Sequence, residues 1–315
     1  MTKSSPLEGK LVTLIGGSGF IGSHVAQDLL ERGARVRIAA REPEKAFKLK
    51  PLANLGQLQL ARCNAMDSNS IEACVAGSDA VAYLIGTFEG DQQRLQADSA
   101  GVAARAAAQN GADSFVYISA IGASPAAATG YYSTKCDGER QVCEAFPKAT
   151  IIRPSVVFGE EAGLVPMFAQ MVQMMPVMPV FGADSKFQLV WVADVAAAVV
   201  KALEEPGKHG GKVFEAAGPD TLSMMKIHEM IAQGQNRKRN FFPMPDMLAR
   251  PFAAFPLTPI NSDQLAMLES GSVASKDALQ LTKLGITPRP LSLFLDRWMV
   301  RYRKHGRFGQ KPAIG

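Results

Sequence analysis

The chain has 315 residues, of which 47% are hydrophobic and 20% charged, and its formal net charge is +5. These proportions are typical of a folded globular protein, and they exclude a disordered chain, a collagen-like chain and a coiled coil. No apolar run approaches the roughly 18 residues that a membrane-spanning helix needs. The small charge excess does not indicate nucleic-acid binding, and we expect no nucleic-acid partner.

The cysteines and the N-terminus indicate a reducing compartment. Four scattered cysteines form no CxxC pair, so we expect reduced thiols and no metal site. Residues 1–10 contain neither an apolar signal core nor an Arg-rich amphipathic stretch. We therefore expect a cytoplasmic bacterial protein without a signal or transit peptide. Such a protein could also associate peripherally with the inner face of the plasma membrane. The cysteines are Cys63, Cys74, Cys136 and Cys143.

Strands and helices alternate through the first half of the chain. The predicted strands are Lys10–Ile15, Arg35–Ala40, Leu58–Arg62, Ala80–Ile85, Ser114–Ser119 and Ala149–Val157. The predicted helices between them are Phe20–Arg32, Ser70–Ala76 and Leu95–Gln109. Such alternation predicts right-handed crossovers and a Rossmann-type α/β fold with a doubly wound parallel sheet.

The composition changes after about residue 160, where proline becomes frequent and methionines cluster in Met167–Met178. We predict a dinucleotide-binding domain over 1–160 and a smaller, mostly C-terminal α/β lobe over 161–315. Two strands are expected within about 186–217, and one or both of them could join the main sheet. We expect these methionines to pack in the core of the lobe rather than to line a pocket for an apolar ligand. The tail Arg297–Lys311 is basic and aromatic. Its role could be contact with lipid, docking on a larger assembly, or none beyond that of a solvated chain end.

A glycine-rich turn follows the first strand and opens the first helix. Glycine is needed there for a tight turn, for close approach of the backbone to a pyrophosphate and for close helix–strand packing. The helix N-terminus then offers free N–H groups and the positive end of its dipole. The predicted cofactor-binding residues of this turn are Gly16, Gly17, Ser18, Gly19, Phe20, Ile21 and Gly22.

Arg41 stands at the end of the second strand, where an NAD site normally carries an acidic residue for the ribose 2′-hydroxyl. A guanidinium suits a 2′-phosphate because it can make bidentate, charge-assisted bonds. Arg37 and Lys45 are expected to add positive potential. We therefore predict NADP(H) as the preferred cofactor, with NAD(H) as the alternative.

Further cofactor contacts are expected where later strands end. Asn64 and Ala65 follow the third strand and are expected to flank the adenine. Leu84, Ile85 and Gly86 close the fourth strand, and the small glycine would let the cofactor pass.

Four motifs in this order resemble the extended short-chain dehydrogenase/reductase superfamily, over roughly residues 10–220. They are the glycine turn, Tyr131-x-x-x-Lys135, the segment Arg153-Pro154-Ser155-Val156-Val157-Phe158-Gly159, and Val192-Ala193-Asp194-Val195. The resemblance implies that Tyr131 is the general acid/base and that Lys135 binds the nicotinamide ribose and lowers the phenol pKa. It also places Pro154, Ser155 and Val156 near the nicotinamide.

The catalytic constellation is incomplete when compared with active members of that superfamily. Those proteins carry a Ser or Thr at the end of the fifth strand, where Ala120 stands here and Ser119 lies one residue earlier. Side chains alternate faces along a strand, so Ser119 is a doubtful substitute as a catalytic residue. It remains a candidate for cofactor binding.

Over nearly its whole length, the chain resembles more closely an atypical branch of the superfamily, which contains the nucleotide-binding accessory subunit of respiratory complex I and its bacterial relatives. The segments that carry this similarity are Ile118–Ala123, Ile151–Gly159, Phe187–Val195, Ala217–Pro219, Thr258–Met267 and Tyr302-Arg303. The resemblance implies an NADP(H)-binding accessory subunit, or an assembly and stability factor, of complex I with little or no turnover. Contact with complex I subunits, membrane lipid or quinone would follow.

Two other functions stay open. One is a free-standing NADPH-dependent reductase, or an epimerase/dehydratase relative, that acts on an apolar carbonyl or a quinone-related substrate. The other is a redox sensor that binds NADP(H) and regulates a partner.

Overall fold

The computed structural model describes residues 5–127, 129–244 and 262–304, which form two compact units. The first unit comprises Met1–Pro154, Val192–Ala216 and Ala274–Thr287. The second comprises Ser155–Trp191, Ala217–Val273 and Pro288–Gly315. The chain thus leaves the first unit at the end of a strand and re-enters it twice.

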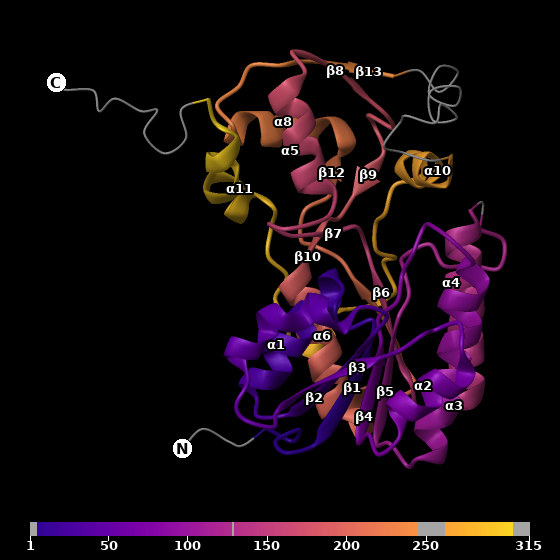
Figure 1. Ribbon diagram of the computed structural model, residues 1–315. Helices are drawn as coiled ribbons and strands as arrows, with labels where there is room; N and C mark the ends of the chain where they lie inside the picture. The colour runs from indigo at the N-terminus through magenta and orange to yellow at the C-terminus, as the bar shows by residue number, and fades with distance from the viewer. Residues whose placement is uncertain (1–4, 128, 245–261, 305–315) are drawn as a thin grey trace. The chain divides into compact units, whose positions relative to one another are not determined.

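An eight-stranded parallel sheet forms the centre of the first unit (Figure 1). Its strand order is β14-β11-β6-β5-β4-β1-β2-β3, so the direction of winding reverses beside β1. The strands are β1 (Leu11–Ile15), β2 (Arg35–Ala40), β3 (Leu58–Arg62), β4 (Ala80–Tyr83), β5 (Ser114–Ile118), β6 (Thr150–Pro154), β11 (Val213–Ala216) and β14 (Leu279–Gln280). This arrangement confirms the predicted Rossmann-type fold.

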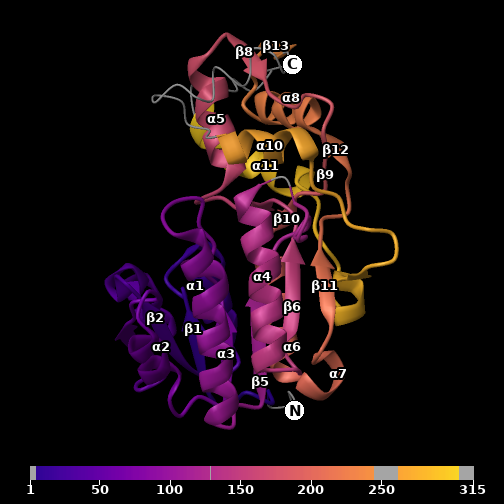
Figure 2. The same ribbon diagram turned by 90° about the vertical axis from the view of Figure 1, so that its right-hand side faces the viewer.

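Helices cover both faces of this sheet. Figure 1 shows α1 (Phe20–Glu31) and α6 (Val192–Glu204) packed together on one face. Figures 1 and 2 show α2 (Ser68–Val75), α3 (Ser99–Gln109) and α4 (Gly130–Ala145) along the other. The shorter helices are η1 (Pro43–Leu52), η2 (Gln93–Asp98), α7 (Pro206–His209) and η3 (Leu281–Leu284).

The central strands are buried throughout, which explains why they are nearly continuous apolar runs. Every residue of β1, β4 and β5 is buried, as expected for parallel strands covered on both faces. The first helix, α1, ends at Glu31, and Gly33 follows its C-cap with a φ of +83° that turns the chain into β2. The sheet therefore brings the carboxyl ends of β1, β4 and β5 to one edge, where open α/β sheets bind ligands.

Three predicted elements differ from the structure. The helix predicted over Leu95–Gln109 begins with the π-helix η2 before α3. The strand predicted over Ala149–Val157 breaks after Pro154, because a proline ring has no N–H to continue a ladder. The strand predicted over Lys186–Val192 forms two short strands of the second unit, whereas β11 lies in the main sheet beside β6.

The second unit is built from short strands and helices. Its two-stranded pairs are β7 (Val157–Phe158) with β10 (Val190–Trp191), β9 (Lys186–Phe187) with β12 (Leu222–Ser223), and β8 (Val177–Val180) with β13 (Asn240–Pro243). Its helices are α5 (Leu164–Met174), α8 (Met224–Gly234), α10 (Ser262–Ser270), α11 (Ser292–Trp298) and η4 (Met299–Tyr302). Within the described ranges, no helix combines the length and apolar character needed to cross a bilayer.

The methionine-rich segment contributes to the core of the second unit. Met167 and Met171 on α5 pack against that core, and Met178 on β8 is fully buried. Met174 ends α5 and is 73% exposed. Most methionines of this segment thus pack in the core of the second unit, as expected. Residues 305–311 of the basic tail, and 258–261 of the Thr258–Met267 segment, lie outside the described residues.

Candidate functional site

The glycine turn between β1 and α1 has no room for side chains. Gly16 has φ of +82°, and a Cβ at Gly17 would lie 2.8 Å from the Leu14 Cβ. A Cβ at Gly22 would lie 2.6 Å from the Gly17 Cα and 2.7 Å from the Gly16 carbonyl oxygen. The third glycine therefore lets α1 pack directly on the turn, as a dinucleotide-binding turn requires.

The N-terminus of α1 is open to an anion. Its N-cap, Gly19, has an extended backbone and contributes no side-chain hydrogen bond, and the first turn contains no acidic residue. Ser18 and Phe20 are only partly buried. The Ser23 hydroxyl donates to the Gly19 carbonyl at 2.8 Å and leaves the first amides untouched. Backbone N–H groups and the helix dipole therefore favour negative charge here.

The basic residues of β2 are in two different environments. Arg41 is exposed, and its guanidinium makes no hydrogen bond or ion pair with any described residue, while its carbonyl accepts from the Arg62 guanidinium at 3.3 Å. Arg37 differs from our expectation, because its guanidinium donates to Gln59 and to the carbonyls of Cys74 and Ala76 at the end of α2. It stabilises that helix end rather than adding a free cation beside Arg41. Lys45 forms an ion pair with Glu42 at 2.9 Å.

The turn after β3 is held by its own hydrogen bonds. The Asn64 amide donates to the Ser70 hydroxyl at 3.0 Å, and the Asn64 side-chain oxygen accepts from the Met66 amide at 3.1 Å. The buried Ala65 accepts a hydrogen bond from the Ser99 hydroxyl through its carbonyl. Asn64 itself is exposed. The turn is thus fixed in place at the edge where the adenine is expected.

The end of β4 meets the helix that carries the predicted catalytic pair. Leu84 is buried, Ile85 partly buried and Gly86 exposed. A Cβ at Gly86 would lie 3.4 Å from the Tyr131 hydroxyl and 3.8 Å from the Lys135 Nζ. The structure therefore brings Gly86, Tyr131 and Lys135 together.

Lys135 is fully buried and bound to two strand ends. Its Nζ donates to the carbonyls of Ile85 and Ile118, each at 2.8 Å. Burial lowers the pKa of Lys135 to about 7, while the Glu139 carboxylate opposes that shift. Two of its three possible donations thus go to the backbone.

Tyr131 lies under an aromatic ring. Its ring stacks on Phe88 with centroids 4.5 Å apart and an interplanar angle of 25°. Burial raises the pKa of Tyr131, and Tyr132 raises it further. The Lys135 Nζ is 6.0 Å from the Tyr131 ring centroid, and the hydroxyl makes no hydrogen bond with a described residue. This environment disfavours the phenolate.

Ser119 carries a buried hydroxyl at this edge. It is 2% exposed, and its hydroxyl oxygen has no hydrogen-bond partner among the described residues. Ala120, at the position where active relatives carry a hydroxyl, is also buried. A buried hydroxyl without a partner is a group that a bound ligand can satisfy.

The residues at the end of β6 and directly after it make contacts within the protein. The Arg153 guanidinium forms a bidentate pair with Glu139 of α4, at 2.8 and 2.6 Å. Pro154 accepts from the Ile121 amide at 2.9 Å through its carbonyl. In the second unit the Ser155 hydroxyl donates to the Ser272 carbonyl at 3.0 Å, and Val156 packs against the core.

Two side chains at this edge were not predicted from the sequence. They are Phe88, which stacks on Tyr131, and Gln96, which is fully buried in η2. The Gln96 amide donates to the Thr134 hydroxyl at 3.2 Å, and its oxygen accepts from the Thr87 amide at 3.4 Å. The sequence signal for a buried polar role of Gln96 is its position on the helix face that continues with Ala100, Ala103 and Ala107.

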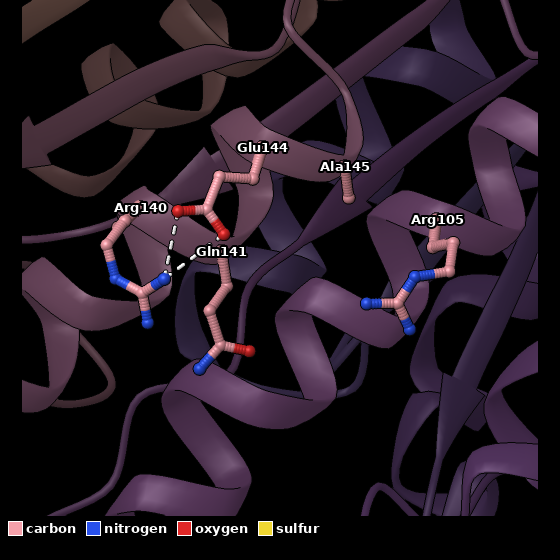
Figure 3. A pocket seen from close by; sticks show the side chains of 5 residues that line it. All are labelled: Arg105, Arg140, Gln141, Glu144 and Ala145. Carbon is pink, nitrogen blue, oxygen red and sulfur yellow. Dashed lines mark hydrogen bonds and ion pairs between the residues drawn. The ribbon is translucent and has the colours of Figure 1, made fainter.

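A hollow of about 320 Å³ lies elsewhere, on the outer surface of α3 and α4 (Figure 3). Arg140 on its wall pairs with Glu144 at 2.9 Å and with Asp137 at 2.5 Å. None of the predicted site residues lines it. We therefore assign the candidate site to the carboxyl edge of the sheet, where glycines, an open helix N-terminus and an unsatisfied hydroxyl meet. The lining residues are Arg105, Arg140, Gln141, Glu144 and Ala145.

The chain belongs to the NmrA-like family, whose model matches residues 8–269. This confirms the resemblance to an atypical branch of the short-chain dehydrogenase/reductase superfamily. Mitochondrial NADH dehydrogenase (ubiquinone) 1 alpha subcomplex subunit 9 of Arabidopsis thaliana is 29% identical, over 96% of this chain and 80% of its own.

Enzymes are also among the similar proteins. A ceramide reductase of Caulobacter vibrioides is 29% identical, over 62% of each chain. The fold matches the UDP-glucose 4-epimerase of Thermus thermophilus, solved in complex with NAD, with a TM-score of 0.68 and 18% identity. That match covers 93% of this chain and 99% of the epimerase.

Proposed function

We propose that the chain binds NADP(H) at the carboxyl edge of the first unit. The observation that carries the proposal is the glycine turn packed directly on an uncapped α1, because this geometry suits a pyrophosphate. The unsatisfied Ser119 hydroxyl and the exposed Gly86 beside Tyr131 and Lys135 fit the nicotinamide ribose. Asn64 and Ala65 would flank the adenine.

Arg41 supports a preference for NADP(H) over NAD(H). Its guanidinium is exposed and free of ion pairs with described residues, so it is available to a 2′-phosphate. Titration of the purified chain with NADPH and NADH tests this preference. Equal affinity for the two would refute it.

We propose further that bound cofactor is turned over slowly or not at all. The ammonium of a catalytic lysine helps a neighbouring tyrosine to ionise. Here Lys135 donates to the carbonyls of Ile85 and Ile118, and the pKa of Tyr131 is raised by burial beneath Phe88. Ala120 also removes the hydroxyl that would polarise a substrate oxygen.

The role that fits a retained but unused cofactor is that of an accessory subunit, or an assembly and stability factor, of respiratory complex I. Nearly full-length relatives carry names of subunits of that enzyme, which supports the proposal. In a bacterial cell the chain would lie at the inner face of the plasma membrane, in contact with complex I subunits and in reach of lipid and quinone. The test is native electrophoresis of gently solubilised membranes from its own host. Migration apart from NADH:ubiquinone oxidoreductase would refute the subunit role.

A free-standing NADPH-dependent reductase is the second candidate. The observation that favours it is the preserved juxtaposition of Tyr131, Lys135 and Gly86, together with the similarity to a ceramide reductase. Its substrate would be an apolar carbonyl or a quinone-related compound. Carbonyl-dependent oxidation of NADPH that disappears in Tyr131→Phe, while NADPH binding persists, would establish this function over the first.

A further inference from the structure

Two cysteines meet at the interface between β3 and α2. Cys63 follows the last residue of β3 and is 2% exposed, and Cys74 lies in the last turn of α2 and is 6% exposed. The Cys74 thiol donates to the Arg62 carbonyl at 3.7 Å, one residue from Cys63. The Cys63 thiol donates to the Ser70 carbonyl at 3.9 Å, one turn before Cys74. Both side chains belong to one packed cluster of buried residues.

The surroundings make the two sulfur atoms unequal. The adjacent Cys63 and the nearby Arg37 guanidinium lower the pKa of Cys74, against the effect of burial. The pKa of Cys63 is raised by the adjacent Cys74 and by burial. Arg37 is fixed there by its bonds to the Cys74 and Ala76 carbonyls, at 2.6 and 2.8 Å. The fixed positive charge of Arg37 therefore favours the thiolate at Cys74 rather than at Cys63.

The segment between these cysteines contains the predicted adenine contacts. Asn64 and Ala65 follow Cys63 directly, and the Asn64 amide is bound to Ser70 of α2. A covalent bond between the sulfur atoms would be about 2.05 Å long, shorter than a thiol–thiol contact. It would therefore pull α2 toward the end of β3 and move the turn that carries Asn64 and Ala65.

We propose that Cys63 and Cys74 are a redox-active pair, oxidised by a peroxide to a disulfide that weakens NADP(H) binding. The Cys74 thiolate attacks one peroxide oxygen, the O–O bond breaks, and Cys74 becomes a sulfenic acid while the second oxygen leaves as water. Cys63 then attacks the Cys74 sulfur, the S–O bond breaks, and a second water leaves. Two thiols are thus oxidised to one disulfide, and one peroxide is reduced to two waters.

The effect on affinity rests on the proposed NADP(H) site, whereas formation of the disulfide does not. We expect affinity for NADPH to fall about tenfold on oxidation, which is within the usual range for coupled sites. The coupling is reciprocal, so saturating NADPH should make the disulfide form less readily by a similar factor. A dithiol reductant should restore the original affinity.

The test uses the full-length chain treated with hydrogen peroxide. The matched control is the double variant Cys136→Ser/Cys143→Ser, which removes the two other described cysteines and keeps the pair. Non-reducing peptide mapping by mass spectrometry identifies the linkage, and NADPH titration before and after oxidation measures the affinity. Cys74→Ser and Cys63→Ser are each tested as well, with the unfolding temperature of the reduced protein as a check on folding.

The expected result is a peptide linked through Cys63 and Cys74 in the double variant, with a reversible loss of affinity, and neither effect in the single variants. The absence of that peptide would overturn the proposal, as would a linked protein with unchanged affinity. A disulfide formed in a chain that binds no NADPH when reduced would support the redox pair and refute the cofactor site.

Discussion

Replacing Gly22 with alanine tests whether α1 must pack directly on the glycine turn. The added Cβ would lie 2.6 Å from the Gly17 Cα and 2.7 Å from the Gly16 carbonyl oxygen. Both are backbone atoms, so no side-chain rotation relieves the contact and α1 must move away from the turn. Overpacking of this kind costs about 1–3 kcal/mol. Alanine regains about 1 kcal/mol of helix propensity, so the unfolding temperature should fall only slightly.

Cofactor affinity should fall much more than stability in Gly22→Ala. The displacement moves the first amides of α1 away from the pyrophosphate, and a loss of about 1.4–2.8 kcal/mol in binding corresponds to a ten- to hundredfold weaker affinity. Fluorescence titration with NADPH measures it. Gly207→Ala is the matched control, because a Cβ there meets nothing within 4 Å. A folded Gly22→Ala protein with unchanged affinity would refute the proposed role of the turn.

Three further perturbations test other parts of the structure. Arg41→Ala should weaken NADPH binding about tenfold or more and leave NADH binding unchanged, as measured by parallel titrations. Arg153→Met should lower the free energy of unfolding by about 3 kcal/mol, because Glu139 would remain partly buried without its partner. The additional change Glu139→Gln should recover much of that loss. Denaturant titrations measure both free energies. Burial lowers the pKa of His228 to about 4, so the unfolded chain binds a proton that the native state does not. Stability should therefore fall as pH is lowered from about 6.5 toward 4, and a His228→Phe protein whose unfolding shows the same pH dependence would contradict this assignment.

Local pattern was sufficient to predict the sheet and the glycine turn. The strands β2 and β3 have the predicted bounds. The apolar run of β2 is largely buried, whereas β3 lies at the edge of the sheet and alternates Leu58 and Leu60 with the exposed Gln59. The glycine turn depends on contacts within a few residues, which the spacing of Gly16, Gly19 and Gly22 encodes directly. The proximity of Tyr131 to Lys135 follows likewise from one helical turn.

Long-range contacts account for what the sequence did not reveal. The π-helix η2 depends on β4 and β5, since the hydroxyls of Tyr83 and Tyr117 bind the Leu95 and Gln96 carbonyls at 2.5 and 2.8 Å. The bonds of Lys135 to two strand ends, and of Arg37 to the end of α2, likewise join elements that are distant in the chain. No periodicity within either element specifies such partners.

We infer that the chain serves complex I by holding NADP(H) rather than by turning it over. The most direct test is to replace the native chain with Tyr131→Phe in its own host and to quantify assembled NADH:ubiquinone oxidoreductase by native electrophoresis. The variant should bind NADPH, migrate with the complex and support as much assembled enzyme as the wild type. A folded, NADPH-binding variant that leaves the complex unassembled would contradict the account. Wild-type protein that never migrates with the complex would contradict it equally.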